Sequence, residues 1–130
     1  MVVGAHAMAF HGVIRSTGDI DLWIKCDDVN SDKVYRALAD FGAPLNDLDK
    51  KDLEKPGNVF QIGVAPNRID ILTSIDGVVF DEAYEGRETV EIVGIKIPVI
   101  SKHHLIENKI TVGRPQDLVD IQKLKETESE

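Results

Sequence analysis

The sequence predicts an α/β (α+β) fold in which a small, mixed, largely antiparallel sheet carries helices packed on one face. Short segments such as 19–24 and 68–72 alternate polar and apolar residues, which is typical of strands with one buried face. Between such segments lie stretches with helical spacing of apolar residues, bounded by capping residues or glycines. At 130 residues the chain is expected to form one domain over 1–126, followed by a frayed acidic tail over 127–130.

The first elements follow from the valines at the start and from one glycine. Residues 2–3 are expected to form a short strand, and residues 5–11 a short helix. Gly12 is expected to end this helix, because glycine suits the left-handed conformation found just past many helices. A strand over 19–24 comes next.

The middle of the chain predicts a helix, a loop and a hairpin. A helix over 31–41 is expected, with Ser31 as its N-cap. Residues 43–58 are polar and bounded by prolines, which favours a loop. Residues 59–64 and 68–72 are expected to pair as an antiparallel hairpin, because both alternate and a proline-containing turn joins them.

The remaining elements are short. Residues 78–87 favour a short helix or turn, and 89–93 and 95–99 read as two strands about a glycine. Ser101 is expected to begin a helix, and Pro115 to begin another, at a position where no amide donor is needed.

Two aspartates within one predicted strand are the main chemical feature. Asp19 and Asp21 alternate with aliphatic residues, so they are expected to share one face of the strand, and Asp70 occupies the same kind of position in 68–72. Asp47 and Asp49 have the same spacing but lie in the polar segment, which favours a solvated loop. Neighbouring carboxylates raise one another's pKa unless a cation lies among them. Three carboxylates from two strands therefore predict a site for Mg²⁺ or Mn²⁺, which prefer oxygen ligands.

A longer pattern surrounds these acids. It consists of Gly4-Ala5, His11-Gly12, Arg15-Ser16-Thr17-Gly18-Asp19-Ile20-Asp21-Leu22 and Asp70. This order resembles the DNA polymerase beta-type nucleotidyltransferase superfamily, and in particular its minimal nucleotidyltransferases and the toxin-type members of abortive-infection systems. In the tail, Lys109, Arg114, Asp117 and Asp120 resemble the motif that closes the catalytic module of the toxin-type members.

The resemblance implies a Mg²⁺- or Mn²⁺-dependent enzyme that transfers an NMP from an NTP to a hydroxyl of RNA, protein or a small molecule, with a role in a toxin–antitoxin pair. Asp19, Asp21 and Asp70 would bind the metal and act in catalysis. The expected nucleotide- and phosphate-binding residues are Gly4, Ala5, Arg15, Ser16, Thr17, Lys109 and Arg114.

Several of these residues also have a plain structural interpretation. Arg15 is equally well explained as a surface loop charge, and Lys109 and Arg114 as basic residues at a helix C-terminus. Asp117 and Asp120 are expected to lie on a solvated helix face.

Two departures from the family pattern favour a different function. The family has Gly-Gly or Gly-Ser where this chain has Gly4-Ala5, and relatives carry a helix and a full strand before that glycine, where this chain has only residues 1–3. The missing elements would leave apolar surface uncovered, so we expect a homodimer or a small helical partner protein, unless the true start lies upstream. The alternative function is a catalytically reduced nucleotide-binding or partner-neutralising module of the same fold.

Charge and composition limit the classes of partner and the cellular location that the sequence predicts. A net charge of −8 argues against a broad nucleic-acid footprint. Cys26 is the single cysteine, so no internal disulfide is expected. The sequence shows no signal peptide and no apolar run long enough to span a membrane, which predicts a cytoplasmic location and no membrane partner.

Overall fold

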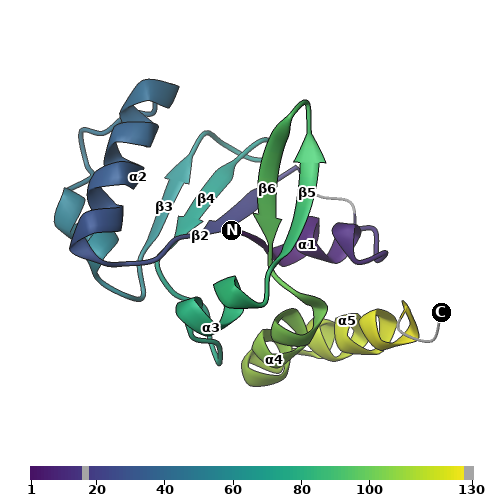
Figure 1. Cartoon of the computed structure of the whole chain (residues 1–130). Coiled ribbons are helices and arrows are strands. Elements are labelled where there is room, and N and C mark those ends of the chain that lie inside the picture. Colours follow the sequence, from purple (N-terminus) through teal and green to yellow (C-terminus); the bar gives the residue numbers. More distant parts are fainter. Residues whose placement is uncertain (16–17, 128–130) are drawn as a thin grey trace.

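The computed structural model describes residues 1–15 and 18–127, which form a mixed sheet of six strands (Figure 1). The strands are β1 (Val2–Val3), β2 (Ile20–Trp23), β3 (Val59–Ile62), β4 (Ile69–Leu72), β5 (Glu88–Ile92) and β6 (Ile95–Val99). Their order across the sheet is β3-β4-β2-β1-β6-β5. Three neighbouring pairs are antiparallel, whereas β1–β6 and β2–β4 are parallel. The predicted fold class is therefore confirmed, including the β3–β4 hairpin.

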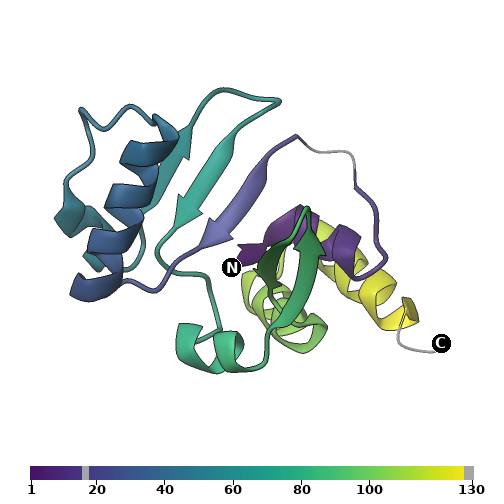
Figure 2. The same ribbon diagram turned by 45° about the horizontal axis from the view of Figure 1, so that its top comes forward.

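Helices pack against this sheet. They are α1 (Gly4–Phe10), α2 (Asp28–Phe41), α3 (Phe80–Glu85), α4 (Lys102–Val112) and α5 (Pro115–Glu126), with a 3₁₀ helix, η1 (Lys50–Glu54), inside the segment expected to be a loop. Asp49 begins η1 through a capping box with Asp52. In Figure 1, α1 lies between the β5–β6 hairpin and α5, and in both views α2 lies apart from α4 and α5 (Figure 2). No helix of the described residues is long and apolar enough to cross a bilayer. Residues 128–130 of the expected tail lie outside the described residues.

Helix α2 begins three residues earlier than the sequence suggested. Its N-cap is Asp27, whose carboxylate accepts a hydrogen bond from the backbone N–H of Asn30 at 2.7 Å. Ser31 is fully buried inside the helix, and its hydroxyl donates to the carbonyl of Asp28 at 2.9 Å. The prediction of Ser31 as N-cap was wrong, because the carboxylate upstream caps the amides and also complements the helix dipole.

Two hydrophobic clusters hold the elements together, and they contact different faces of the central strands. Leu38 of α2 packs with Ile71 of β4, whereas the next residue, Leu72, packs against the cluster that joins α1, α4 and α5 to β1 and β6. Trp23, which alternates with the aliphatic residues facing α2, contacts Phe80 of α3 edge-on at 5.0 Å. The sequence predicted helices on one face of the sheet, but they pack against both faces. The reason is that the apolar side chain of Trp23 is also buried and that of Leu72 is partly buried.

The turn of the β5–β6 hairpin contains an unfavourable residue. Val93 and Gly94 connect the strands with φ angles of 51° and 78°. A two-residue hairpin turn of this kind favours asparagine at its first position, whereas a β-branched residue is strained there. We expect Val93→Asn to raise the free energy of unfolding by about 1 kcal/mol, measured by urea denaturation. Val64→Asn is the control, because Val64 is also exposed but lacks a positive φ. Equal changes in the two variants would contradict this account.

Candidate active site

The parallel pairing of β2 with β4 brings the predicted acids together. Asp21 lies directly opposite Asp70, and the backbone N–H of Ile20 donates to the carbonyl of Arg68 at 3.0 Å. Asp19 and Arg68 each precede these aspartates by two residues. Since side chains two residues apart on a strand share a face, all four side chains lie on the same side of the sheet.

Arg68 is the cation of this group. Its Nε donates to one Asp70 carboxylate oxygen at 2.7 Å, and one of its terminal nitrogens donates to the other at 3.1 Å. The same terminal nitrogen lies 3.3 Å from Asp19. Arg68 opens the segment 68–72 that the sequence predicted as a strand, but it was not among the predicted site residues. The available signal was its spacing of two residues from Asp70 within one strand.

The environment of Asp21 disfavours its charged form. Burial raises the pKa of Asp21 above its ordinary value, and the negative charges of Asp70 and Asp19 and a hydrogen bond with Asp70 raise it further. The positive charge of Arg68 opposes this rise. One guanidinium therefore does not neutralise three neighbouring carboxylates, and the group retains an excess of negative charge.

Helix α1 begins directly against this group. Gly4, the first residue of α1, has a φ of 68°, and a Cβ atom there would collide with the carboxylate of Asp21. Glycine is thus required for this close approach, and Ala5 follows it in the helix. Of the other predicted phosphate-binding residues, Ser16 and Thr17 lie outside the described residues.

The donor set of the group fits a hard divalent cation. Asp19, Asp21 and Asp70 offer only carboxylate oxygens, which suit Mg²⁺ or Mn²⁺, and their excess negative charge calls for a cation. Their oxygens do not all lie within 4.8 Å of one another. In the described part of the chain that closeness is found only for His103, His104 and Glu107 on the surface of α4.

The predicted basic residues of the tail lie in a separate ionic network. Lys109 of α4 donates to Asp120 of α5 at 2.9 Å, and Arg15 donates to the same carboxylate at 2.8 Å. Arg114 forms a two-pronged contact with Asp117, at 2.8 and 3.3 Å. The structure thus pairs Arg15, Lys109 and Arg114 with carboxylates and does not place them in the group of Asp19, Asp21 and Asp70.

The expectation that Asp117 and Asp120 are solvated was wrong. Both side chains are about 1% exposed. A hydrogen bond from Arg114 lowers the pKa of Asp117 against the effect of burial. Burial likewise opposes ionisation of Asp120, but hydrogen bonds from Gln116 and Lys109 and the charge of Arg15 bring its pKa below the ordinary value. Facing cations across the α4–α5 contact make this burial tolerable, and a single-helix pattern cannot show them.

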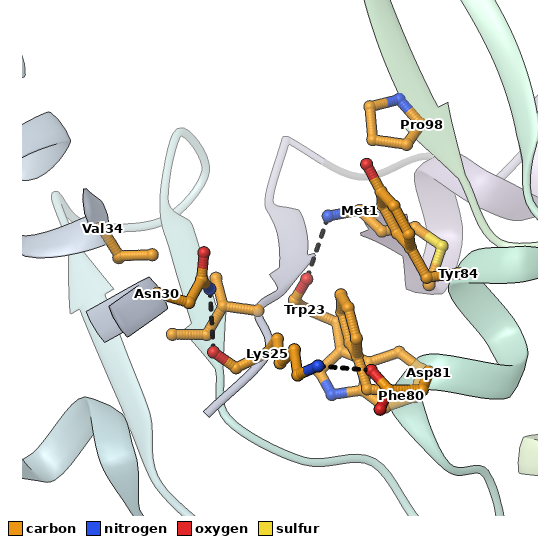
Figure 3. Close-up of a pocket in the computed structure, with 10 residues that line it drawn as sticks. Met1, Trp23, Lys25, Asn30, Val34, Phe80, Asp81, Tyr84 and Pro98 are labelled. Atoms are coloured by element: carbon orange, nitrogen blue, oxygen red, sulfur yellow. Dashed lines mark hydrogen bonds and ion pairs between the residues drawn. The ribbon is translucent and has the colours of Figure 1, made fainter. Parts of the chain in front are cut away.

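A pocket of about 490 Å³ lies at the end of β2, between α2 and α3 (Figure 3). Val34 and Tyr84 stand on opposite sides of it, and the ion pair of Lys25 with Asp81, at 2.9 Å, lies at its base. Trp23 also lines it, two residues beyond Asp21 and so about 7 Å further along the strand. The pocket contains none of the three predicted metal ligands.

Comparison with known proteins supports the fold. No family model matches the chain, and no curated protein matches it in sequence. Among solved structures, it is similar to the lincosamide antibiotic adenylyltransferase LnuA, determined with lincomycin bound, at 18% sequence identity and a TM-score of 0.53. The match covers 95% of this chain and 84% of LnuA. The similarity shows that the chain shares the fold of LnuA. In this chain Asp21 of β2 and Asp70 of β4 lie together beside the start of α1.

The raised pKa of Asp21 predicts a dependence of stability on pH. The pKa of Asp21 in the folded state lies above the ordinary value of 3.8. Ionisation of Asp21 therefore lowers the free energy of unfolding as the pH rises from 3.8 through the folded-state pKa. With a chelator present, we expect Asp21→Asn to be more stable than the wild type at neutral pH. The difference should vanish near about pH 3, where the wild-type carboxyl is protonated in both states. Urea denaturation across this range measures it, and an Asn variant that is less stable at neutral pH would refute it.

The burial of Asp120 predicts a structural cost. In Asp120→Ala the ammonium of Lys109 loses its closest partner and stays buried beside Asp117, at 3.5 Å. We expect the free energy of unfolding to fall by about 3 kcal/mol, measured by urea denaturation. The control is Asp40→Ala on the exposed surface of α2, which should change it by less than about 0.5 kcal/mol. A solvated role for Asp120 would make the two variants alike.

Proposed function

We propose that this chain is a divalent-metal-dependent nucleotidyltransferase that moves an NMP from an NTP to a hydroxyl group. The supporting observation is the register of β2 with β4, which sets Asp21 opposite Asp70 with Asp19 beside them, within a nucleotidyltransferase fold. Asp19, Asp21 and Asp70 would hold Mg²⁺ or Mn²⁺. When bound, the metal neutralises the triphosphate and polarises the α-phosphate.

In the proposed reaction, a side chain of the protein accepts the proton that the acceptor hydroxyl loses. The oxygen of the acceptor hydroxyl forms a bond to the α-phosphorus, the bond from that phosphorus to the bridging oxygen breaks, and pyrophosphate leaves. A carboxylate oxygen of Asp70 takes the proton of the hydroxyl. Asp70 suits this role because it lies opposite Asp21 in the register of β2 with β4 and its side chain is only 12% exposed.

We infer that the acceptor is a small molecule rather than a nucleic acid. A net charge of −8 disfavours binding of RNA or DNA. The structural neighbour LnuA is an antibiotic adenylyltransferase and was determined with lincomycin bound, which supports a small acceptor. This neighbour lends no support to the toxin–antitoxin role, which stays a prediction from the sequence.

A second function, a partner-binding module without turnover, is favoured by apolar surface. Phe41 at the end of α2 is 66% exposed, and Ile95 and Ile92 of the β5–β6 hairpin are 64% and 53% exposed. Grooves lined almost wholly by aliphatic and aromatic side chains adjoin both regions. Apolar surface of this kind marks interaction sites in soluble proteins, including contacts within a homodimer or with a helical partner.

Transfer of label from α-³²P-ATP, with Mg²⁺ or Mn²⁺ and a panel of hydroxyl-bearing acceptors that includes lincomycin, tests the proposal. We expect Asp19→Asn and Asp70→Asn to lower the rate at least about 100-fold, and a chelator to abolish transfer. The matched control is Asp47→Asn, which alters an exposed aspartate of the second Asp-x-Asp pair and should leave the rate unchanged. Nucleotide binding without transfer to any acceptor would favour the module instead.

A further inference from the structure

Arg68 occupies the oxygens that a metal ion would need. Its guanidinium contacts both carboxylate oxygens of Asp70 and also reaches Asp19. A divalent ion bound by the same carboxylates would face the guanidinium's positive charge across the same few ångströms and would lose those ligand atoms to it. The two cations therefore compete for one set of oxygens.

We propose that Arg68 is a resident cation that holds the acids together without metal, and that nucleotide phosphates draw it away so that metal and nucleotide bind cooperatively. This inference rests on the proposed function. It makes Arg68 a positioning residue, whose departure from Asp70 and Asp19 accompanies loading of the site.

The position of Arg68 suits such a movement. It lies immediately before β4, and its side chain is 29% exposed, so the guanidinium has a path to solvent. Its backbone N–H donates to Asp19 at 3.3 Å, a contact that does not depend on the guanidinium. The side chain can thus leave while the main chain still orients Asp19.

The chemistry of the site explains why a nucleotide would trigger the exchange. Guanidinium binds phosphate oxygens in the same two-pronged manner as it binds a carboxylate. A triphosphate arriving with its metal supplies both a cation for Asp70 and an anion for Arg68. The metal replaces Arg68 at the carboxylates, and the phosphates replace the carboxylates at Arg68. Each ligand thus strengthens binding of the other, which is a positive coupling between two binding events.

Metal binding measured without turnover tests this. Mn²⁺ is titrated by electron paramagnetic resonance, alone and with an ATP analogue that carries a methylene between the α- and β-phosphates. We expect Arg68→Gln to bind Mn²⁺ about 10-fold more tightly than the wild type without the analogue. The analogue should strengthen Mn²⁺ binding strongly in the wild type and weakly in Arg68→Gln.

Two further variants separate competition from a general charge effect. Arg68→Lys keeps a cation but loses the two-pronged contact, so its Mn²⁺ affinity should fall between the other two. Arg36→Gln removes one positive charge from the exposed surface of α2 and should match the wild type. If Arg68→Gln does not fold, as judged by urea denaturation, Arg68→Lys carries the test.

Different failures have different meanings. Equal Mn²⁺ affinity in all variants, or weaker binding by Arg68→Gln, would overturn the role of Arg68 and leave the proposed function intact. Absence of Mn²⁺ binding by the wild type, with and without the analogue, would overturn both.

Discussion

The parallel pairing of β2 with β4 is the constraint on which the candidate site depends. Slipping the register by one residue would turn Asp70 to the opposite face of the sheet, away from Asp21. The register is held by burial, because Ile71 must stay in the cluster beneath α2 while Leu72 stays in the other. Packing on both faces of the strand thus fixes the relative positions of the carboxylates.

Two groups of charged side chains in this fold differ in their balance. Around Asp21 three carboxylates share one guanidinium, and burial together with like charge raises the pKa of Asp21. Across α4 and α5, two buried carboxylates face Lys109, Arg114 and Arg15, and their pKa values are lowered. The cations of the second group neutralise its carboxylates, and the group stabilises the contact between α4 and α5. The first group retains an excess of negative charge, which supports our proposal that it binds the metal.

Patterns within single segments were sufficient to predict much of this molecule. Alternation identified the strands around Asp21 and Asp70, and the turn after β3 identified the hairpin. The contrast between Asp19–Asp21 and Asp47–Asp49 needed only the apolar neighbours of the first pair. Helix boundaries were less certain, as Ser31 shows, because capping by Asp27 competes with a plausible cap a few residues later.

Contacts between distant segments could not be read in this way. The cationic partners of Asp120 lie on α4 and after α1, so its burial depends on elements that meet only in the folded chain. The same is true of Arg68, whose second acceptor, Asp19, is 49 residues earlier. Residue type and spacing along one strand or helix specify which face a side chain occupies. Whether that face meets solvent, a cation or another carboxylate depends on long-range packing. Long-range packing therefore makes the group around Asp21 differ from the ionic network of α4 and α5.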